Sequence, residues 1–152
     1  MLFYENIYVA VDGSKEAEYA FKKAIAISKR NEGAKIHLYH IIDDRSTTTI
    51  VDAFDRTYIT EATKYAEELL QEYKAKATAA GVPDVETYIG KGSPKNLLLK
   101  VFSKLKDTDL VICGATGLNR VERMFIGSVS DNIVRSSGCD VLVVRTPDPK
   151  EI

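Results

Sequence analysis

The fold is decided by residues 114–128, which read GATGLNRVERMFIGS. They follow DLVIC at 109–113, an apolar run that predicts a buried strand, and they lead into a pattern that predicts a helix from Ser128. Glycine lets backbone N–H groups approach an anion closely, and the N-terminus of a helix adds unpaired donors and a favourable dipole. A strand, a glycine-bounded loop and a helix in this order therefore indicate a backbone cradle for a phosphate chain.

The rest of the chain alternates strand and helix patterns around this segment. Runs of apolar and β-branched residues predict strands at 7–12, 35–42, 85–89, 109–114 and 140–145. Apolar residues at helical spacing predict helices at about 14–31, 57–80, from 94 onward, and 128–137, while residues 43–56 show no clear period and predict a long connection. Five strands that alternate with four helices predict an α/β fold: a doubly wound, five-stranded parallel sheet with helices on both faces, as a single domain over residues 1–152.

Composition narrows the class of protein and of partner. The formal net charge of −1 gives no support for a nucleic-acid or anionic-membrane partner. No apolar run is long enough for a membrane span and the N-terminus lacks a signal-peptide layout, so we expect a cytoplasmic protein. Cys113 and Cys139 lack metal-ligand spacing and are expected to pack as small apolar residues. His37 and His40 are expected to pack or to cap rather than to bind metal.

The turn after the first strand is the second candidate site. In an open α/β sheet a ligand binds beyond the carboxyl ends of the strands, where the strand order reverses. With the order 3-2-1-4-5 that point lies between the first and fourth strands, and Asp12 faces the glycine segment. Its carboxylate could accept hydrogen bonds from ribose hydroxyls or help to hold a phosphate-bound metal, or it could serve the turn or cap the first helix. Ser128 could bind a phosphate or cap its helix, and Arg120 and Arg123 could reach a triphosphate or lie in solvent.

The whole pattern resembles the universal stress protein family. The family signature G-x2-G-x9-G-S/T is matched without a change in spacing by Gly114, Gly117, Gly127 and Ser128. The similarity extends from IYVAVD at 7–12 through HIID at 40–43 to VLVV at 141–144. The resemblance implies a flavodoxin-like, Rossmann-like fold with strand order 3-2-1-4-5, and it places the chain in the branch of the family that binds ATP.

The resemblance also implies a set of nucleotide-binding residues. Asp12 is expected near the ribose, at the end of a strand in which Ala10 stands where some relatives have proline. Ile41 is expected to contact the adenine through its backbone and side chain. The glycine segment is expected to supply the other contacts, to ribose and phosphates. The full expected set is Ala10, Val11, Asp12, Ile41, Gly114, Thr116, Gly117, Gly127, Ser128 and Val129.

Three functions are consistent with such a site, and ATP, with or without Mg²⁺, is the expected ligand in each. The first is an ATP-binding switch in stress adaptation with little or no catalysis, because the segment offers a phosphate cradle without an evident catalytic base. The second is slow hydrolysis or transfer of phosphate, in which Asp12 or Asp43 could serve as the water-activating base together with Mg²⁺. The third is a dimeric interaction module in which the nucleotide is structural.

The last strand predicts a partner of the protein's own kind. Val141, Leu142, Val143 and Val144 form an apolar run that is expected at the edge of the sheet, and such edges are usually covered or paired. Members of the family commonly dimerise through this strand. The resemblance therefore implies a homodimer through residues 141–144.

Overall fold

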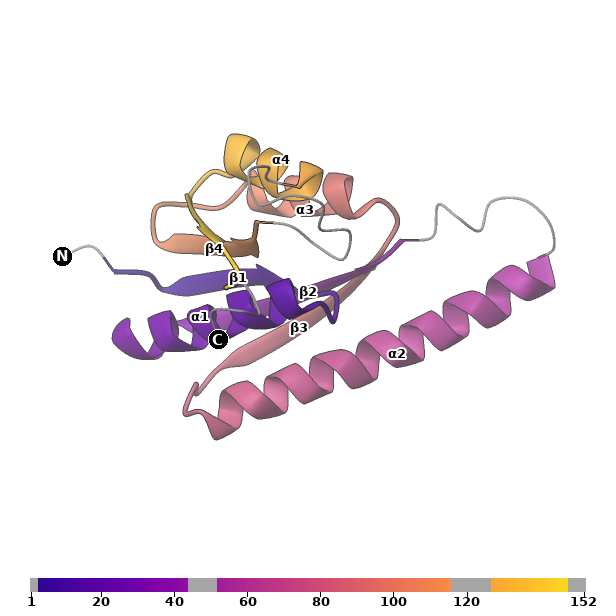
Figure 1. The fold of residues 1–152 in the computed structure, drawn as a ribbon, viewed down its shortest axis with the longest axis horizontal. Coiled ribbons are helices and arrows are strands. Elements are labelled where there is room, and N and C mark those ends of the chain that lie inside the picture. Colours follow the sequence, from indigo (N-terminus) through magenta and orange to yellow (C-terminus); the bar gives the residue numbers. More distant parts are fainter. Residues whose placement is uncertain (1–2, 44–51, 116–126, 148–152) are drawn as a thin grey trace.

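The computed structural model describes residues 3–43, 52–115 and 127–147, with side chains from residue 57 onward in the second range. Strands and helices alternate along these residues, and Figure 1 shows one sheet between two layers of helices. Their bounds are β1 (Asn6–Ala10), α1 (Lys15–Arg30), β2 (Lys35–Ile42), α2 (Asp52–Ala79), β3 (Val85–Lys91), α3 (Pro94–Phe102), β4 (Asp109–Gly114), α4 (Ser128–Ser136) and β5 (Asp140–Val144).

The sheet has five strands in the order β3-β2-β1-β4-β5, which confirms the predicted fold class and strand order. All neighbouring strands pair in parallel, and Tyr8 of β1 lies opposite His37 of β2 on one side and Val111 of β4 on the other. The strand order reverses between β1 and β4. The carboxyl ends of these two strands therefore lie side by side, where this kind of fold binds ligands.

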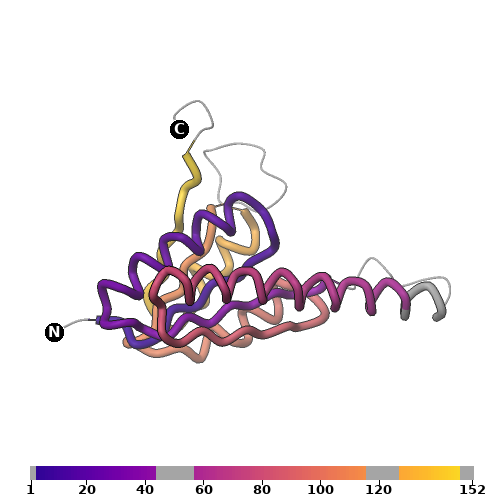
Figure 2. The backbone as a smooth tube through the Cα atoms, turned by 90° about the horizontal axis from the view of Figure 1, so that it is seen from below, coloured from indigo at the N-terminus to yellow at the C-terminus, as the bar shows by residue number. Residues whose placement is uncertain are grey.

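Two apolar layers hold the helices on the sheet. The helices α1 and α2 cover one face, and α3 and α4 cover the other (Figures 1 and 2). In the first layer Phe21 of α1 meets Tyr73 of α2 edge to face, with ring centroids 4.8 Å apart. In the second layer the buried Phe102 of α3 meets Tyr8 and Tyr39 in the same edge-to-face manner. Because successive strand residues face opposite layers, the sheet contributes to both.

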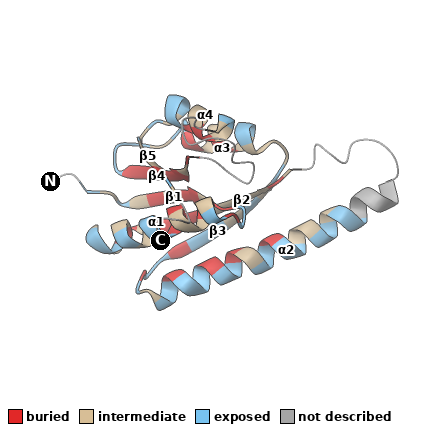
Figure 3. Cartoon of the chain, viewed as in Figure 1, coloured by how far each residue is buried: buried red, intermediate tan, exposed pale blue. Residues whose placement is uncertain are grey.

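The helix α2 is longer than predicted, and its outer side is exposed (Figure 3). It begins at Asp52, so residues 52–56 belong to a helix and not to the predicted connection. Leu70 is buried, but Tyr65 is 54% exposed. In α4, Val134 is also exposed, since Ile133 takes the inward position on that turn. No helix of the described residues, α2 included, combines the length and apolar character that a membrane span requires.

The remaining element bounds differ from the predicted ones by one or two residues. β1 ends at Ala10 rather than at residue 12, because the chain turns out of the sheet through Gly13, which has a φ of +82°. β3 extends to Lys91, whereas α4 and β5 end at Ser136 and Val144. β2 and β4 occupy the predicted residues 35–42 and 109–114.

Both histidines pack within the structure, as expected. His37 is buried and stacks on Tyr8 with ring centroids 4.3 Å apart, and its Nε2 lies 2.9 Å from Asn6 Oδ1. Burial lowers the pKa of His37. Within the described ranges no group of three or more His, Cys, Asp or Glu side chains is placed to hold a metal ion.

Candidate functional site

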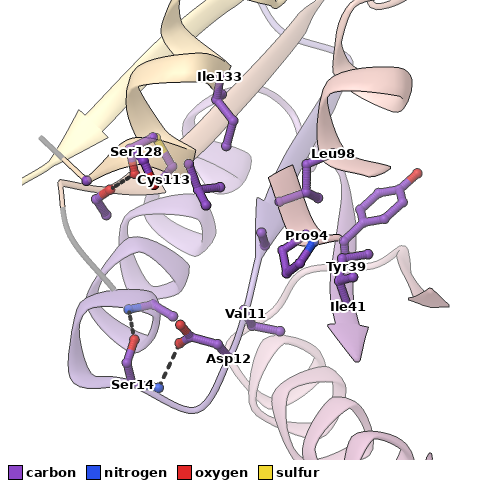
Figure 4. Close-up of a pocket in the computed structure, with 16 residues that line it drawn as sticks. Val11, Asp12, Ser14, Tyr39, Ile41, Pro94, Leu98, Cys113, Ser128 and Ile133 are labelled. Carbon is purple, nitrogen blue, oxygen red and sulfur yellow. Dashed lines mark hydrogen bonds between the residues drawn. The ribbon is translucent and has the colours of Figure 1, made fainter. Parts of the chain in front are cut away.

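A pocket of about 420 Å³ opens at the carboxyl ends of β1 and β4, and this volume is typical of small-molecule sites. The turn after β1 and the two ends of the glycine segment meet in it, as the strand order requires (Figure 4). Eight of the residues expected from the sequence line it: Ala10, Val11, Asp12, Ile41, Gly114, Gly127, Ser128 and Val129. The other two, Thr116 and Gly117, lie outside the described residues, as do Arg120 and Arg123.

The turn after β1 is held by two local hydrogen bonds. Ser14 N donates to Asp12 Oδ1 at 2.9 Å, and Ala17 N donates to Ser14 Oγ at 3.1 Å. Ser14 is thus the N-cap of α1, and Asp12 serves the turn rather than the cap. Asp12 also lines the pocket with an exposed side chain. The two interpretations that the sequence left open for this residue are therefore compatible.

The two ends of the glycine segment are tied together by hydrogen bonds. Ser130 Oγ donates to Gly114 O at 2.6 Å, and Gly127 N donates to Ala115 O at 2.7 Å. The N-terminus of α4 is thereby fixed against the carboxyl end of β4. Ser130 is buried and lines the pocket, but periodicity alone marks it only as an inward residue of α4.

The N-terminus of α4 opens on the pocket. Gly127 occupies the N-cap position and has no side chain to cap with, so Ser128 is the first helical residue and not the cap. The first intrahelical bond runs from Asp131 N to Gly127 O at 2.9 Å. The N–H groups of the residues before Asp131 lie ahead of this bond and have no acceptor within the helix. These donors and the positive end of the helix dipole suit an anion.

The opposite wall of the pocket is apolar, and sequence reasoning missed most of it. Tyr39 and Ile41 lie on the same side of β2, and Pro94 and Leu98 reach the pocket from the first turns of α3 (Figure 4). Tyr39 is itself backed by Tyr88 of β3, with stacked rings 4.5 Å between centroids. The period-2 alternation that pairs Ile41 with Tyr39 was a signal that could have found this wall.

Cys113 lies at the end of β4 and lines the pocket. Its side chain is buried, as predicted, and burial raises the pKa of its thiol to about 11, an effect that the neighbouring Ser130 hydroxyl partly opposes. Cys139 also packs against the apolar layer under α3 and α4, but it is only partly buried, because it lies in the loop before the edge strand β5. Burial also raises the pKa of Cys139 to about 11.

Acidic groups are sparse in the described lining. Asp12 is the one carboxylate there, and Asp43 does not line the described part of the pocket. A Mg²⁺ ion usually binds through one or two carboxylates together with substrate phosphates and water. Asp12 therefore fits a metal that is carried mainly by the phosphates of a ligand.

Comparison with known proteins gives matches over nearly the whole chain. The model of the universal stress protein family matches residues 3–145, a range that contains every element of the pocket. A chain from Staphylococcus haemolyticus that is named as a universal stress protein is 48% identical over 151 residues, which are 99% of this chain and 90% of the relative.

Two solved structures resemble the fold closely. Universal stress protein UspA from Lactobacillus plantarum superposes with a TM-score of 0.80 at 27% identity, over 94% of this chain and 99% of that chain. A crystal structure of a universal stress protein in complex with cAMP superposes with a TM-score of 0.69 at 28% identity, over 95% of this chain and 99% of that chain.

Proposed function

This chain belongs to the universal stress protein family, and we propose that it binds an adenine nucleotide, with ATP as its main ligand, and acts as a nucleotide-dependent regulatory switch. The observation that carries the proposal is the division of the pocket between β1 and β4 into an apolar wall and an end lined by backbone donors. A nucleotide has the same division, since its base offers flat aromatic faces that pack on apolar side chains and its phosphates are anionic. The related protein that was crystallised with cAMP supports a purine nucleotide as the class of ligand.

The apolar wall would hold the base. Ile41 and Leu98 offer aliphatic surface, and Tyr39, backed by Tyr88, offers an aromatic ring. When a base and these side chains are removed from water, the binding free energy becomes more favourable by roughly 25 cal/mol for each Å² of apolar surface buried. This wall would supply affinity for the base without depending on the charge of the phosphates.

The phosphates would lie at the N-terminus of α4. Val129 and Ser130 present backbone N–H groups there, and the Ser128 hydroxyl can donate as well. The helix macrodipole adds about half a positive charge at this end. Asp12, across the pocket, would accept hydrogen bonds from ribose hydroxyls and would help to hold Mg²⁺ when the ion accompanies the phosphates.

The experiment that tests this function is calorimetric titration of the purified protein with ATP, ADP, AMP and cAMP. Gly127→Val is the decisive variant: the backbone at Gly127 has φ −59° and ψ 156°, which valine tolerates, so the new side chain is expected to obstruct the pocket mouth and leave the fold intact. Ser136→Val, at the exposed far end of the same helix, is the matched control. We expect wild type and Ser136→Val to bind ATP below millimolar concentration and Gly127→Val to lose binding. Absence of ATP binding to the wild type, or undiminished binding to Gly127→Val, contradicts the proposal.

The same samples separate a switch from an enzyme. Mass spectrometry of the denatured protein identifies the small molecule that survives purification, and a phosphate-release assay with Mg²⁺ measures turnover. The switch predicts bound ATP without turnover. Turnover that persists through purification and disappears in Asp12→Ala identifies a slow ATP hydrolase instead.

We also propose that two copies pair through β5. This strand is one edge of the sheet, and Leu142 is a large apolar side chain that is 37% exposed there. An apolar edge strand is a template for pairing with another strand. Light scattering after size-exclusion chromatography is expected to give a dimer for the wild type and a monomer for Leu142→Lys. A monomeric wild type contradicts the pairing.

A further inference from the structure

Two side chains contact the β1 turn from the face of the sheet opposite the pocket wall. Tyr39 and Ile41 face the pocket, so His40 between them faces α2. The His40 ring meets the ring of Tyr65 at a centroid distance of 6.3 Å and an angle of 70°. Residues 11–13 therefore lie between the pocket on one side and His40 and Tyr65 on the other.

His40 donates a hydrogen bond to the backbone one residue beyond the end of β1. Its Nδ1 lies 2.7 Å from Val11 O. A carbonyl oxygen only accepts, so Nδ1 carries the hydrogen. The backbone N–H of Val11 donates to Tyr39 O at 2.8 Å, so both polar groups of this residue are held by β2.

The bond to Val11 O also sets the direction of the next N–H group. Val11 C=O and Asp12 N–H belong to one planar trans peptide and point in opposite directions. Because His40 holds the carbonyl toward β2, the Asp12 N–H points away from β2, toward the β4 side where the pocket lies. A donor is thereby directed at the place where the strand order reverses.

Tyr65 covers the next residue of the turn. A Cβ added to Gly13 would lie 2.9 Å from the Tyr65 hydroxyl oxygen and 3.9 Å from Leu69 Cδ1. Gly13 also has a φ of +82°, which side-chain-bearing residues rarely adopt. Side chains of α2 therefore lie directly against the turn at Gly13, where a larger residue would not fit.

We propose that His40 is a positioning residue for the nucleotide pocket, and that Tyr65 confines its ring. Together they orient the Asp12 N–H as a donor to the ligand and fix the carbon skeleton from which the Asp12 carboxylate projects. This inference rests on the proposed nucleotide binding. It adds a connection between α2 and the ligand that passes through the β1 turn.

The test replaces His40 by leucine and by asparagine. Leucine removes the donor, whereas the amide nitrogen of asparagine occupies the position of Nδ1 and can donate to Val11 O. Because one hydrogen bond contributes up to a factor of about ten, we expect His40→Leu to weaken the ATP Kd by about tenfold and His40→Asn to restore most of it. Asn31→Leu is the matched control, because it also removes a side-chain bond to a backbone carbonyl, from Asn31 Nδ2 to Ile27 O at 2.8 Å, but at the opposite end of α1 from the turn; it is expected to leave the Kd of the folded protein unchanged.

A second measurement does not depend on the ligand. In the nucleotide-free protein, amide hydrogen exchange at residues 11–14 is expected to quicken in His40→Leu and to return toward wild type in His40→Asn. An unchanged Kd and unchanged exchange in His40→Leu overturn the inference, as does equal loss in both variants. If the wild type binds no nucleotide, the proposed function fails, while the exchange measurement still decides whether His40 holds the turn.

Discussion

Removal of the Ser130 hydroxyl is the change whose effects on stability and binding the structure predicts in most detail. It is buried and donates to Gly114 O at 2.6 Å, so it joins α4 to β4 at the two ends of the glycine segment. Ser130→Ala removes the donor and leaves a partly buried carbonyl without it. The expected cost is about 1–2 kcal/mol of folding free energy. For a chain of this size the midpoint of thermal unfolding falls by roughly 2–8 °C.

The same substitution is expected to weaken nucleotide binding, because the phosphate donors at the start of α4 lose their fixed distance from β4. We expect an ATP Kd about three- to tenfold higher, measured by calorimetry at a temperature where the variant is fully folded. Ser137→Ala is the matched control: its Oγ donates to Ile133 O at 2.7 Å, within the same helix, so its loss affects stability without separating α4 from β4. Ser130→Thr keeps a hydroxyl and is expected to recover affinity. The reasoning is refuted if Ser130→Ala binds ATP like the wild type, or if Ser137→Ala weakens binding equally.

Three further predictions concern packing and reactivity. Phe21→Ala empties a fully buried site that meets the ring of α2 and is expected to cost about 3–5 kcal/mol in denaturant unfolding; a cost below 1 kcal/mol contradicts the assigned core. Gly138→Ala brings a Cβ to 2.4 Å from Leu105 O and is expected to lower the free energy of unfolding by about 1–3 kcal/mol. An unchanged melting temperature contradicts this prediction and shows that the loop moves aside. With its pKa raised from 9.0 to about 11, Cys113 is expected to carry about 100-fold less thiolate than an ordinary cysteine near pH 8. Alkylation of a Cys139→Ser variant should therefore be slow at pH 8, should quicken as the pH rises toward 11 and should slow further with bound nucleotide, whereas fast alkylation at pH 7 contradicts the burial.

Most strands and helices could be predicted from the sequence, because the patterns that indicate them lie in consecutive residues. The apolar runs at 35–42 and 109–114 gave β2 and β4 at their observed bounds, and Ser14 marked the start of α1. The start of α2 was missed because residues 52–56 lack a clear apolar period, although they are helical. Tyr65 fits the apolar period of α2 and contacts His40 of β2 but is 54% exposed, because periodicity reports the direction of a side chain and not how completely its neighbours cover it.

The same distinction between local patterns and long-range contacts applies to the candidate site. The sequence by itself determined the kinds of element, the place of the glycine segment before α4 and the likeness to the universal stress protein family, since each depends on consecutive residues. Only the tertiary structure decided that Pro94 and Leu98 complete the pocket wall, that Ser130 bonds to Gly114 and that His40 bonds to Val11. These contacts join residues from different strands and helices. Their existence depends on strand order, on register and on the height at which each helix crosses the sheet, and no short stretch of sequence specifies those.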